Sequence, residues 1–164
     1  MSILKMKDKK RGFTLLELLV VVAIIAVIVS VTLVVLSDSR DKGADAAIKA
    51  NLNTIRGQSE LFYSNNSNSF LPSGGTDVSG ICPSYNPSGT SMFSNDKTIS
   101  DAIVEAVKRG GNGSACYNSS INWAVAIGLK SDANTAWCVD SGGNSKLVSS
   151  VPASAINSGT LLCN

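Results

Sequence analysis

One acidic residue near the start of a long apolar run places the strongest constraint on how this chain can fold. A basic stretch, Lys9-Lys10-Arg11-Gly12, leads into Phe13, and Glu17 follows four residues later. After Glu17 the run from Leu18 to Leu36 is interrupted by only two hydroxyl residues. An unpaired carboxylate at the centre of a membrane helix costs about 2.5–3.5 kcal/mol. Glu17 is therefore either a misfit or one half of a pair whose cationic partner comes from elsewhere.

The apolar run is long enough to cross a membrane. As a helix, Leu18–Leu36 spans about 28 Å, close to the thickness of a bilayer core. The cations that precede the run favour a cytoplasmic leader and an exported C-terminal body, because cytoplasmic flanks are rich in lysine and arginine. We expect one transmembrane span at about residues 15–36.

The stretch from Lys10 to Leu18 resembles the class III signal of bacterial type IV pilins and type II secretion pseudopilins. The resemblance implies that a membrane prepilin peptidase cleaves between Gly12 and Phe13, and that the new amino group of Phe13 is methylated. It also implies that Glu17 pairs with the Phe13 amine of a neighbouring subunit. Cleavage would then supply the cation that the buried carboxylate needs.

The same resemblance implies partners and a location. The partners are other copies of this chain in a helical homopolymer, the prepilin peptidase, a pilus assembly platform and a motor ATPase. The chain would first lie in the inner (cytoplasmic) membrane with its C-terminal domain outside, and then in an extracellular filament.

Two simpler interpretations of the N-terminal segment are open. In the first, the segment is an uncleaved signal anchor and Glu17 faces the lipid headgroups. In the second, it is a cleavable secretory signal peptide, whose apolar core has 7–15 residues and ends at a small-x-small site. The run here is longer and ends Val-Val-Leu-Ser-Asp, which argues against the second interpretation.

Charge and composition exclude several function classes. The leader carries five cationic residues and one aspartate, so the formal charge of +2 becomes −2 once residues 1–12 are removed. A nearly neutral mature chain argues against a general nucleic-acid-binding surface, and we expect no nucleic-acid partner. The chain contains no histidine, which removes most acid–base and triad chemistry. We therefore expect no enzyme activity and no catalytic residue.

All four cysteines lie beyond the apolar run, in the part expected to be exported: Cys82, Cys116, Cys138 and Cys163. An even number of cysteines in an exported domain indicates two disulfides. Zinc is the competing interpretation, but the chain has neither a Cys-x-x-Cys pair nor a histidine. The residues leave three pairings open.

The resemblance helps to choose among these pairings. Many pilins have a C-terminal disulfide loop, which favours Cys138 with Cys163. We also favour Cys82 with Cys116, a bond that would tie down a loop segment with little core of its own. Each closure stabilises a fold by about 3–4 kcal/mol in the chain-entropy model.

Periodicity predicts an α+β fold in which a long N-terminal helix packs on a small antiparallel sheet. Apolar residues recur at steps of three and four from Gly43, which predicts an amphipathic helix that continues the transmembrane one and ends near Tyr63. We expect a leader at 1–12, this helix at 13–63 and a disulfide-tied globular head at 64–164. Within the head we expect a helix at Thr98–Lys108 with Ile99, Ile103, Val104 and Val107 on its apolar face. Three segments alternate like the strands of a meander: 121–130, 135–140 and 145–149.

Other candidate sites are weak. Asp132, Asp140 and Asn144 could lend oxygens to calcium, but aspartate and asparagine are ordinary turn formers and the spacing is not that of an EF-hand. The glycine-rich stretch after Lys108-Arg109 lacks the Lys-Ser/Thr of a phosphate loop. The Asn-x-Ser triplets at Asn65 and Asn118 match a glycosylation signal that arises easily by chance in this composition. We expect no metal and no cofactor.

Three functions are compatible with these features. The first is a structural subunit of a type IV pilus that polymerises through its N-terminal helix. The second is a type II secretion pseudopilin. The third is a minor pilin that acts as an adhesin or a DNA-uptake receptor, which a basic patch on the head would favour.

Overall fold

The computed structural model describes residues 12–164, apart from the side chains of Leu33 and Val34. The predicted basic leader lies almost entirely outside the described residues. The chain divides into two compact units, with the boundary between Asp38 and Ser39. We describe each unit by itself.

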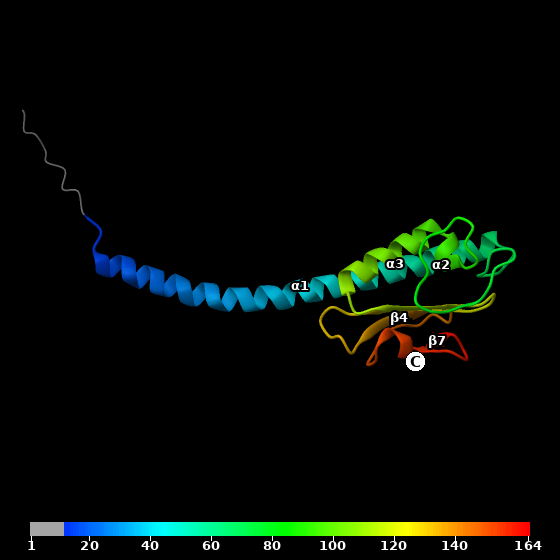
Figure 1. Ribbon diagram of the computed structural model, residues 1–164. Helices are drawn as coiled ribbons and strands as arrows, with labels where there is room; N and C mark the ends of the chain where they lie inside the picture. Colours follow the sequence, from blue (N-terminus) through cyan, green and yellow to red (C-terminus); the bar gives the residue numbers. More distant parts are fainter. Residues whose placement is uncertain (1–11) are drawn as a thin grey trace, which may run out of the picture. The chain divides into compact units, whose positions relative to one another are not determined.

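The first unit consists of the apolar part of helix α1, which is drawn in blue in Figure 1. Helix α1 extends from Leu15 to Asn65, so the predicted long N-terminal helix is confirmed, and it ends two residues beyond the predicted Tyr63. By length and composition α1 is able to cross a membrane, and no residue of its most apolar stretch is buried. Within residues 12–164, no other element covers this apolar stretch.

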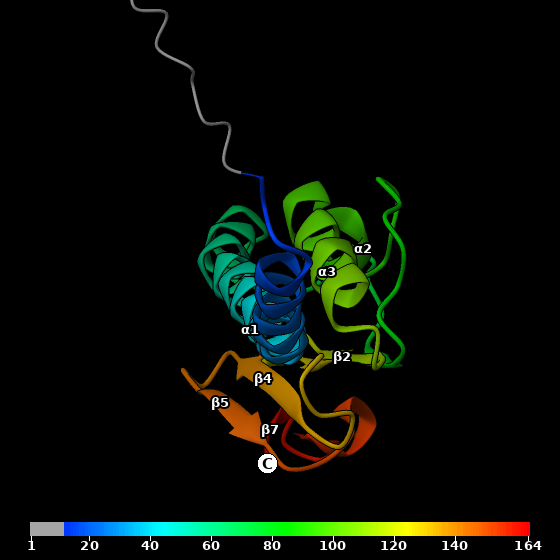
Figure 2. The same cartoon turned by 90° about the vertical axis from the view of Figure 1, so that its left-hand side faces the viewer.

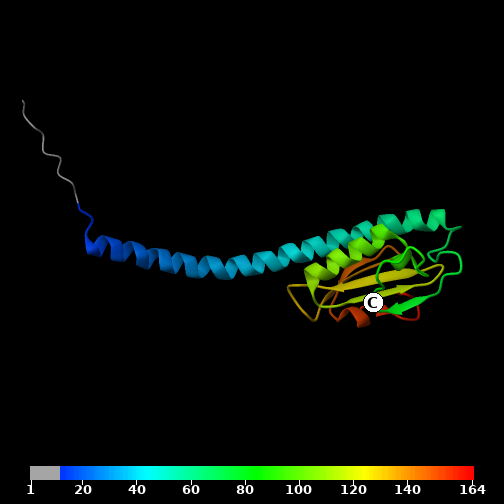
Figure 3. The ribbon, with the colours of Figure 1, turned by 45° about the horizontal axis from the view of Figure 1, so that its top comes forward.

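The second unit is built on a five-stranded antiparallel sheet whose strands follow one another in chain order (Figure 3). The strands are β1 (Val78–Gly80), β2 (Ser114–Asn118), β3 (Trp123–Gly128), β4 (Ala136–Asp140) and β5 (Ser145–Val148). The predicted three-stranded meander corresponds to β3, β4 and β5. Two further strands, β1 and β2, extend it on the side of β3, with Val125 paired to Cys116 in β2 and to Val139 in β4.

Helices cover one face of this sheet (Figure 2). They are the part of α1 that belongs to this unit, α2 (Met92–Asn95) and α3 (Lys97–Gly110). The large side chains of β3 point to this face, as their alternation predicted, and pack against the apolar face of α1. The core contains, among others, Ile48, Leu52, Ile55, Phe62, Trp123, Val125 and Ile127.

The other face of the sheet is covered by the C-terminal tail. The tail forms a short 3₁₀ helix, η1 (Pro152–Ser154), and a small hairpin of β6 (Ile156–Asn157) and β7 (Leu162–Cys163). Small side chains dominate this second core, which contains Ala115, Ala124, Ala126, Ala136, Cys138, Ala155, Ile156 and Cys163. The sheet therefore has two buried faces, and the tail folds back as a bridged Cys163 requires.

Helix α3 has clear ends. Asp96 is the N-cap, and its Oδ1 accepts a hydrogen bond of 3.0 Å from the Ile99 backbone N–H. Gly111 is the C-cap with φ of 74°, a left-handed conformation that glycine adopts at low cost. The predicted apolar face needs one correction, because Val104 is 43% exposed. The buried face is formed by Ile99, Ala102, Ile103 and Ala106, and the two small alanines were overlooked.

Candidate assembly site

Three hydrogen bonds between Thr14 and Glu17 close the first turn of α1. The Thr14 backbone N–H and its hydroxyl donate to Glu17 Oε2 at 2.9 and 2.8 Å, and the Glu17 backbone N–H donates to Thr14 Oγ1 at 3.2 Å. This arrangement is a capping box, which satisfies backbone donors that a helix start leaves unpaired. This role of Thr14 was not predicted, although the Thr-x-x-Glu spacing is typical of a capping box.

The predicted cleavage junction lies immediately before this turn. Gly12 and Phe13 precede the first helical residue, Leu15, and the Phe13 side chain is 74% exposed. A Cβ added to Gly12 would meet no atom within 4 Å among the described residues other than its chain neighbours, so there is open space beside Gly12. Cleavage after Gly12 and methylation of Phe13 stay predictions. The predicted pair of Glu17 with Phe13 joins two subunits, and a single chain does not test it.

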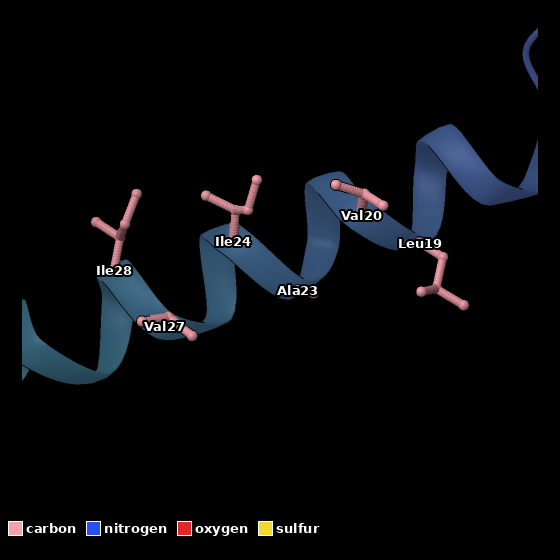
Figure 4. Close-up of a pocket in the computed structure, with 6 residues that line it drawn as sticks. All are labelled: Leu19, Val20, Ala23, Ile24, Val27 and Ile28. Atoms are coloured by element: carbon pink, nitrogen blue, oxygen red, sulfur yellow. The ribbon is translucent and has the colours of Figure 1, made fainter.

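The apolar half of α1 exposes large side chains in every direction. Between Leu15 and Leu36 the large apolar side chains with a described placement are between 45 and 81% exposed. On one face they line a shallow furrow of about 410 Å³, formed by Leu19, Val20, Ala23, Ile24, Val27 and Ile28. Figure 4 shows Val20, Ile24 and Ile28 in a row along the helix, with the small Ala23 beside them. Such a surface is stable only in lipid or against other apolar helices.

The two hydroxyl residues of the apolar run are satisfied within the helix. The Ser30 hydroxyl donates to the Val27 carbonyl at 2.7 Å, and the Thr32 hydroxyl donates to the Val29 carbonyl at 3.0 Å. These back-bonds leave neither hydroxyl as a free donor on the apolar surface. The segment can therefore lie in a medium that offers no hydrogen bonds.

Disulfides tie the second unit together. Cys82 is joined to Cys116 and Cys138 to Cys163, which are the two pairs that the sequence analysis favoured among three. The first bond links the segment after β1 to the neighbouring strand β2. The second links the C-terminal tail to the central part of the sheet. One disulfide therefore lies on each face of the sheet.

The residues considered for calcium form hydrogen bonds within the fold. Asp140 is buried, and its oxygens accept hydrogen bonds from the Asn144 backbone, the Asn144 amide and the Cys163 backbone. Asp132 accepts from the Asn134 backbone N–H at 2.9 Å and so shapes its own turn. Among residues 12–164 no three acidic, cysteine or histidine side chains come together as metal ligands.

A further buried carboxylate, Asp45, escaped the sequence analysis. It lies on the inner face of α1 and accepts from the Lys130 backbone N–H at 2.6 Å and from the backbone and hydroxyl of Ser131. It therefore fixes the turn between β3 and β4 against the helix. The signal was present, since Asp45 stands three residues before Ile48 on the apolar face of an amphipathic helix.

Comparison with known proteins supports the resemblance drawn from the N-terminal residues. Residues 7–36 match the family model of the prokaryotic N-terminal methylation motif. Together with the long apolar helix and the α+β unit, this match confirms the class III signal and supports a protein of the type IV pilin and pseudopilin kind. No curated protein and no solved structure matches the chain. The motif is common to pilus subunits and pseudopilins and does not distinguish between them.

Proposed function

We propose that this protein is a structural subunit of a type IV pilus, anchored in the inner membrane by its apolar helix until cleavage after Gly12 releases it for polymerisation. The observation that carries the proposal is the uncovered apolar half of α1, which begins with a carboxylate next to the cleavage junction. A simple membrane anchor explains the apolar surface but gives no reason for Glu17. A filament core explains both.

Glu17 keeps one oxygen free for a partner. Its Oε2 is occupied by Thr14, whereas no hydrogen bond among the described residues uses its Oε1. We infer that the capping box orients the side chain and that Oε1 receives the methylated Phe13 amine of the next subunit. Because desolvation offsets much of the attraction in a buried ion pair, its main effect is on the axial register of subunits.

Helix packing supplies the rest of the assembly. Leaving lipid for helix–helix contact gains little from the hydrophobic effect, so close packing sets the geometry. The small Ala23 beside the row of Val20, Ile24 and Ile28 offers a place where a neighbouring helix can approach closely. Extraction of the apolar segment from the membrane requires work, which is consistent with a motor ATPase as partner.

Three variants separate the two roles of Glu17, which are to cap the helix and to carry a charge. Glu17→Gln keeps an oxygen that accepts from Thr14 and so preserves the capping box, but it removes the charge. Thr14→Ala weakens the cap by about 1 kcal/mol and keeps the charge. Glu17→Val removes both. We expect surface filaments to be lost or strongly reduced with Glu17→Gln and Glu17→Val, and to persist with Thr14→Ala.

The exposed Glu60 on the second half of α1 provides a matched control, and Glu60→Gln should leave filaments unchanged. Equal amounts of each variant in the membrane fraction show that insertion is intact. Normal filament number with Glu17→Gln would refute the proposed pair. A deletion strain that keeps its filaments but loses secretion of folded exoproteins would assign the chain to the pseudopilins instead.

A further inference from the structure

The segment that follows α1 forms a polar depression at the end of the second unit. The depression measures about 340 Å³ and lies within the size range of small-molecule sites. Five of its lining residues carry amides or hydroxyls: Asn65, Asn66, Ser67, Ser69 and Ser73. Leu71 and Pro72 supply the apolar part of the lining. No lysine, arginine, aspartate or glutamate lines it, so any ligand it favours is uncharged.

The walls of this depression are held in place. The backbone N–H groups of Asn66 and Asn68 both donate to the Tyr63 carbonyl, at 3.2 and 3.1 Å, and the Asn66 amide donates to the Phe62 carbonyl at 2.9 Å. Phe70, two residues after Asn68, is buried. Its ring lies 4.6 Å from that of Tyr63 and 6.4 Å from that of Trp123. The loop is therefore anchored to the core on both sides of its tip.

The tip of the loop has an unusual backbone. Ser67 and Asn68 are consecutive non-glycine residues with φ of 55° and 60°, in the left-handed region. Asparagine tolerates this conformation, but serine adopts it less readily. Such backbone outliers cluster at binding sites, where the surrounding contacts maintain them. Here the turn at Ser67 and Asn68 lies between lining residues on both sides, with Asn65 and Asn66 before it and Ser69 after it.

Several polar groups of the depression have no partner in the described chain. The Asn65 amide and the hydroxyls of Ser67 and Ser73 make no hydrogen bond among residues 12–164, and the Asn66 amide oxygen is also free to accept. Amides and hydroxyls together offer both donors and acceptors without charge. A ligand that matches them needs several hydroxyl groups and an apolar face of C–H groups for Leu71 and Pro72. That combination describes a sugar ring.

We propose that this depression is a binding site for a neutral saccharide. The proposal does not depend on filament assembly, since all of its residues lie beyond the apolar half of α1. It also names no biological source for the sugar, because host glycans and bacterial surface polysaccharides share the same chemistry.

The test is a titration of the ¹⁵N-labelled full chain in phosphocholine micelles, chosen because glycoside detergents would compete. The probes are galactose, glucose, mannose and N-acetylglucosamine, with glucuronate as a charged comparison. We expect at least one neutral sugar to shift the amide signals of residues 64–73 selectively, and glucuronate to bind no more tightly than glucose. A response to N-acetylglucosamine alone would point to amino-sugar polymers, and a response to galactose or mannose to hexose-bearing glycans.

Variants of the lining residues, with a control pair elsewhere on the unit, test whether the sugar binds in this depression. The double change Asn65→Ala with Ser67→Ala removes two hydrogen-bonding groups and should weaken binding about tenfold. Ser73→Ala, which leaves the strained backbone untouched, should weaken it about threefold to fivefold. Asn134→Ala with Ser149→Ala changes the same residue types on the same unit and should leave binding unchanged. Each sugar is added up to about 100 mM, far above a millimolar Kd. The proposal is overturned if no neutral sugar shifts the signals of residues 64–73 selectively. It is also overturned if the control pair weakens binding as much as the changes in the depression do.

Discussion

Asp140 Oδ2 accepts a hydrogen bond of 2.8 Å from the backbone N–H of Cys163, and the sulfur of Cys163 is bonded to Cys138, two residues before Asp140. A buried side chain and a covalent bond thus hold the same residue of the tail against the same strand. The same carboxylate accepts two further hydrogen bonds from Asn144, in the turn that leads into β5. Asp140 therefore couples the tail to the last hairpin of the sheet.

This coupling makes Asp140 more important for stability than an ordinary turn residue. Asp140→Asn replaces one acceptor oxygen with an NH₂ group, which cannot accept from the N–H groups of Asn144 and Cys163. At least one buried hydrogen bond is therefore lost. We expect a destabilisation of about 1–3 kcal/mol. Thermal unfolding of the full chain in micelles, followed by circular dichroism, measures the effect. Asp132→Asn, in the exposed turn between β3 and β4, is the control, and an equal loss in both variants would contradict the assigned role.

A second prediction of the same kind concerns Asp45, which lies in α1 on the helix-covered face of the sheet. Its removal leaves the Lys130 and Ser131 backbone donors without their buried acceptor. Asp45→Ala should therefore destabilise the second unit by about 1–3 kcal/mol and speed amide exchange at 129–131. Asp41→Ala, one turn earlier on α1, serves as the control. Unchanged protection at 129–131 in Asp45→Ala would show that the turn is held by other contacts.

The two disulfides make a prediction about thiol reactivity and linkage. Their sequence separations are 34 for Cys82–Cys116 and 25 for Cys138–Cys163. In the chain-entropy model, each removal costs about 3–4 kcal/mol. Alkylation without reduction should modify no cysteine, and peptide mapping should recover these two linkages. A peptide that joins Cys116 to Cys138 would disprove the pairing.

Two glycines in helices should respond to the same substitution with opposite signs. A Cβ on Gly110 would lie 2.1 Å from the Gly128 carbonyl oxygen, so α3 and β3 would have to separate. Gly110→Ala should therefore destabilise the unit. Gly43 lies in α1 with no atom near its would-be Cβ, and Gly43→Ala should stabilise by up to about 1 kcal/mol. The two thermal midpoints check both signs, and a stable Gly110→Ala would show that α3 has room to move.

The elements with strong periodicity were predictable from the sequence. In β3 large residues alternate with alanine and glycine, and this pattern gave both the strand and the face that meets α1. In α1 the steps between Ile48, Leu52 and Ile55 gave the buried face. These patterns are local consequences of side-chain direction in strands and helices.

Other parts were not predictable because their order comes from distant contacts. Strand β1 has only three residues, and β2 has the sequence Ser-Ala-Cys-Tyr-Asn without a run of large apolar side chains. Both exist because they pair with a neighbour, and such tertiary context outweighs β propensity. In the assembly segment the processing junction after Gly12 and the pairing of Glu17 come from the resemblance to the class III signal, and both stay predictions. The capping role of Thr14 is predictable from the Thr-x-x-Glu spacing, because a capping box is a local arrangement.

The central claim is that this chain enters a filament after cleavage between Gly12 and Phe13. Mass spectrometry of material sheared from the cell surface tests it most directly, because one spectrum gives the N-terminus and its modification. The account predicts subunits that begin at Phe13 and carry one methyl group on the new amine. Filaments whose subunits retain the leader and begin at Met1 would contradict it.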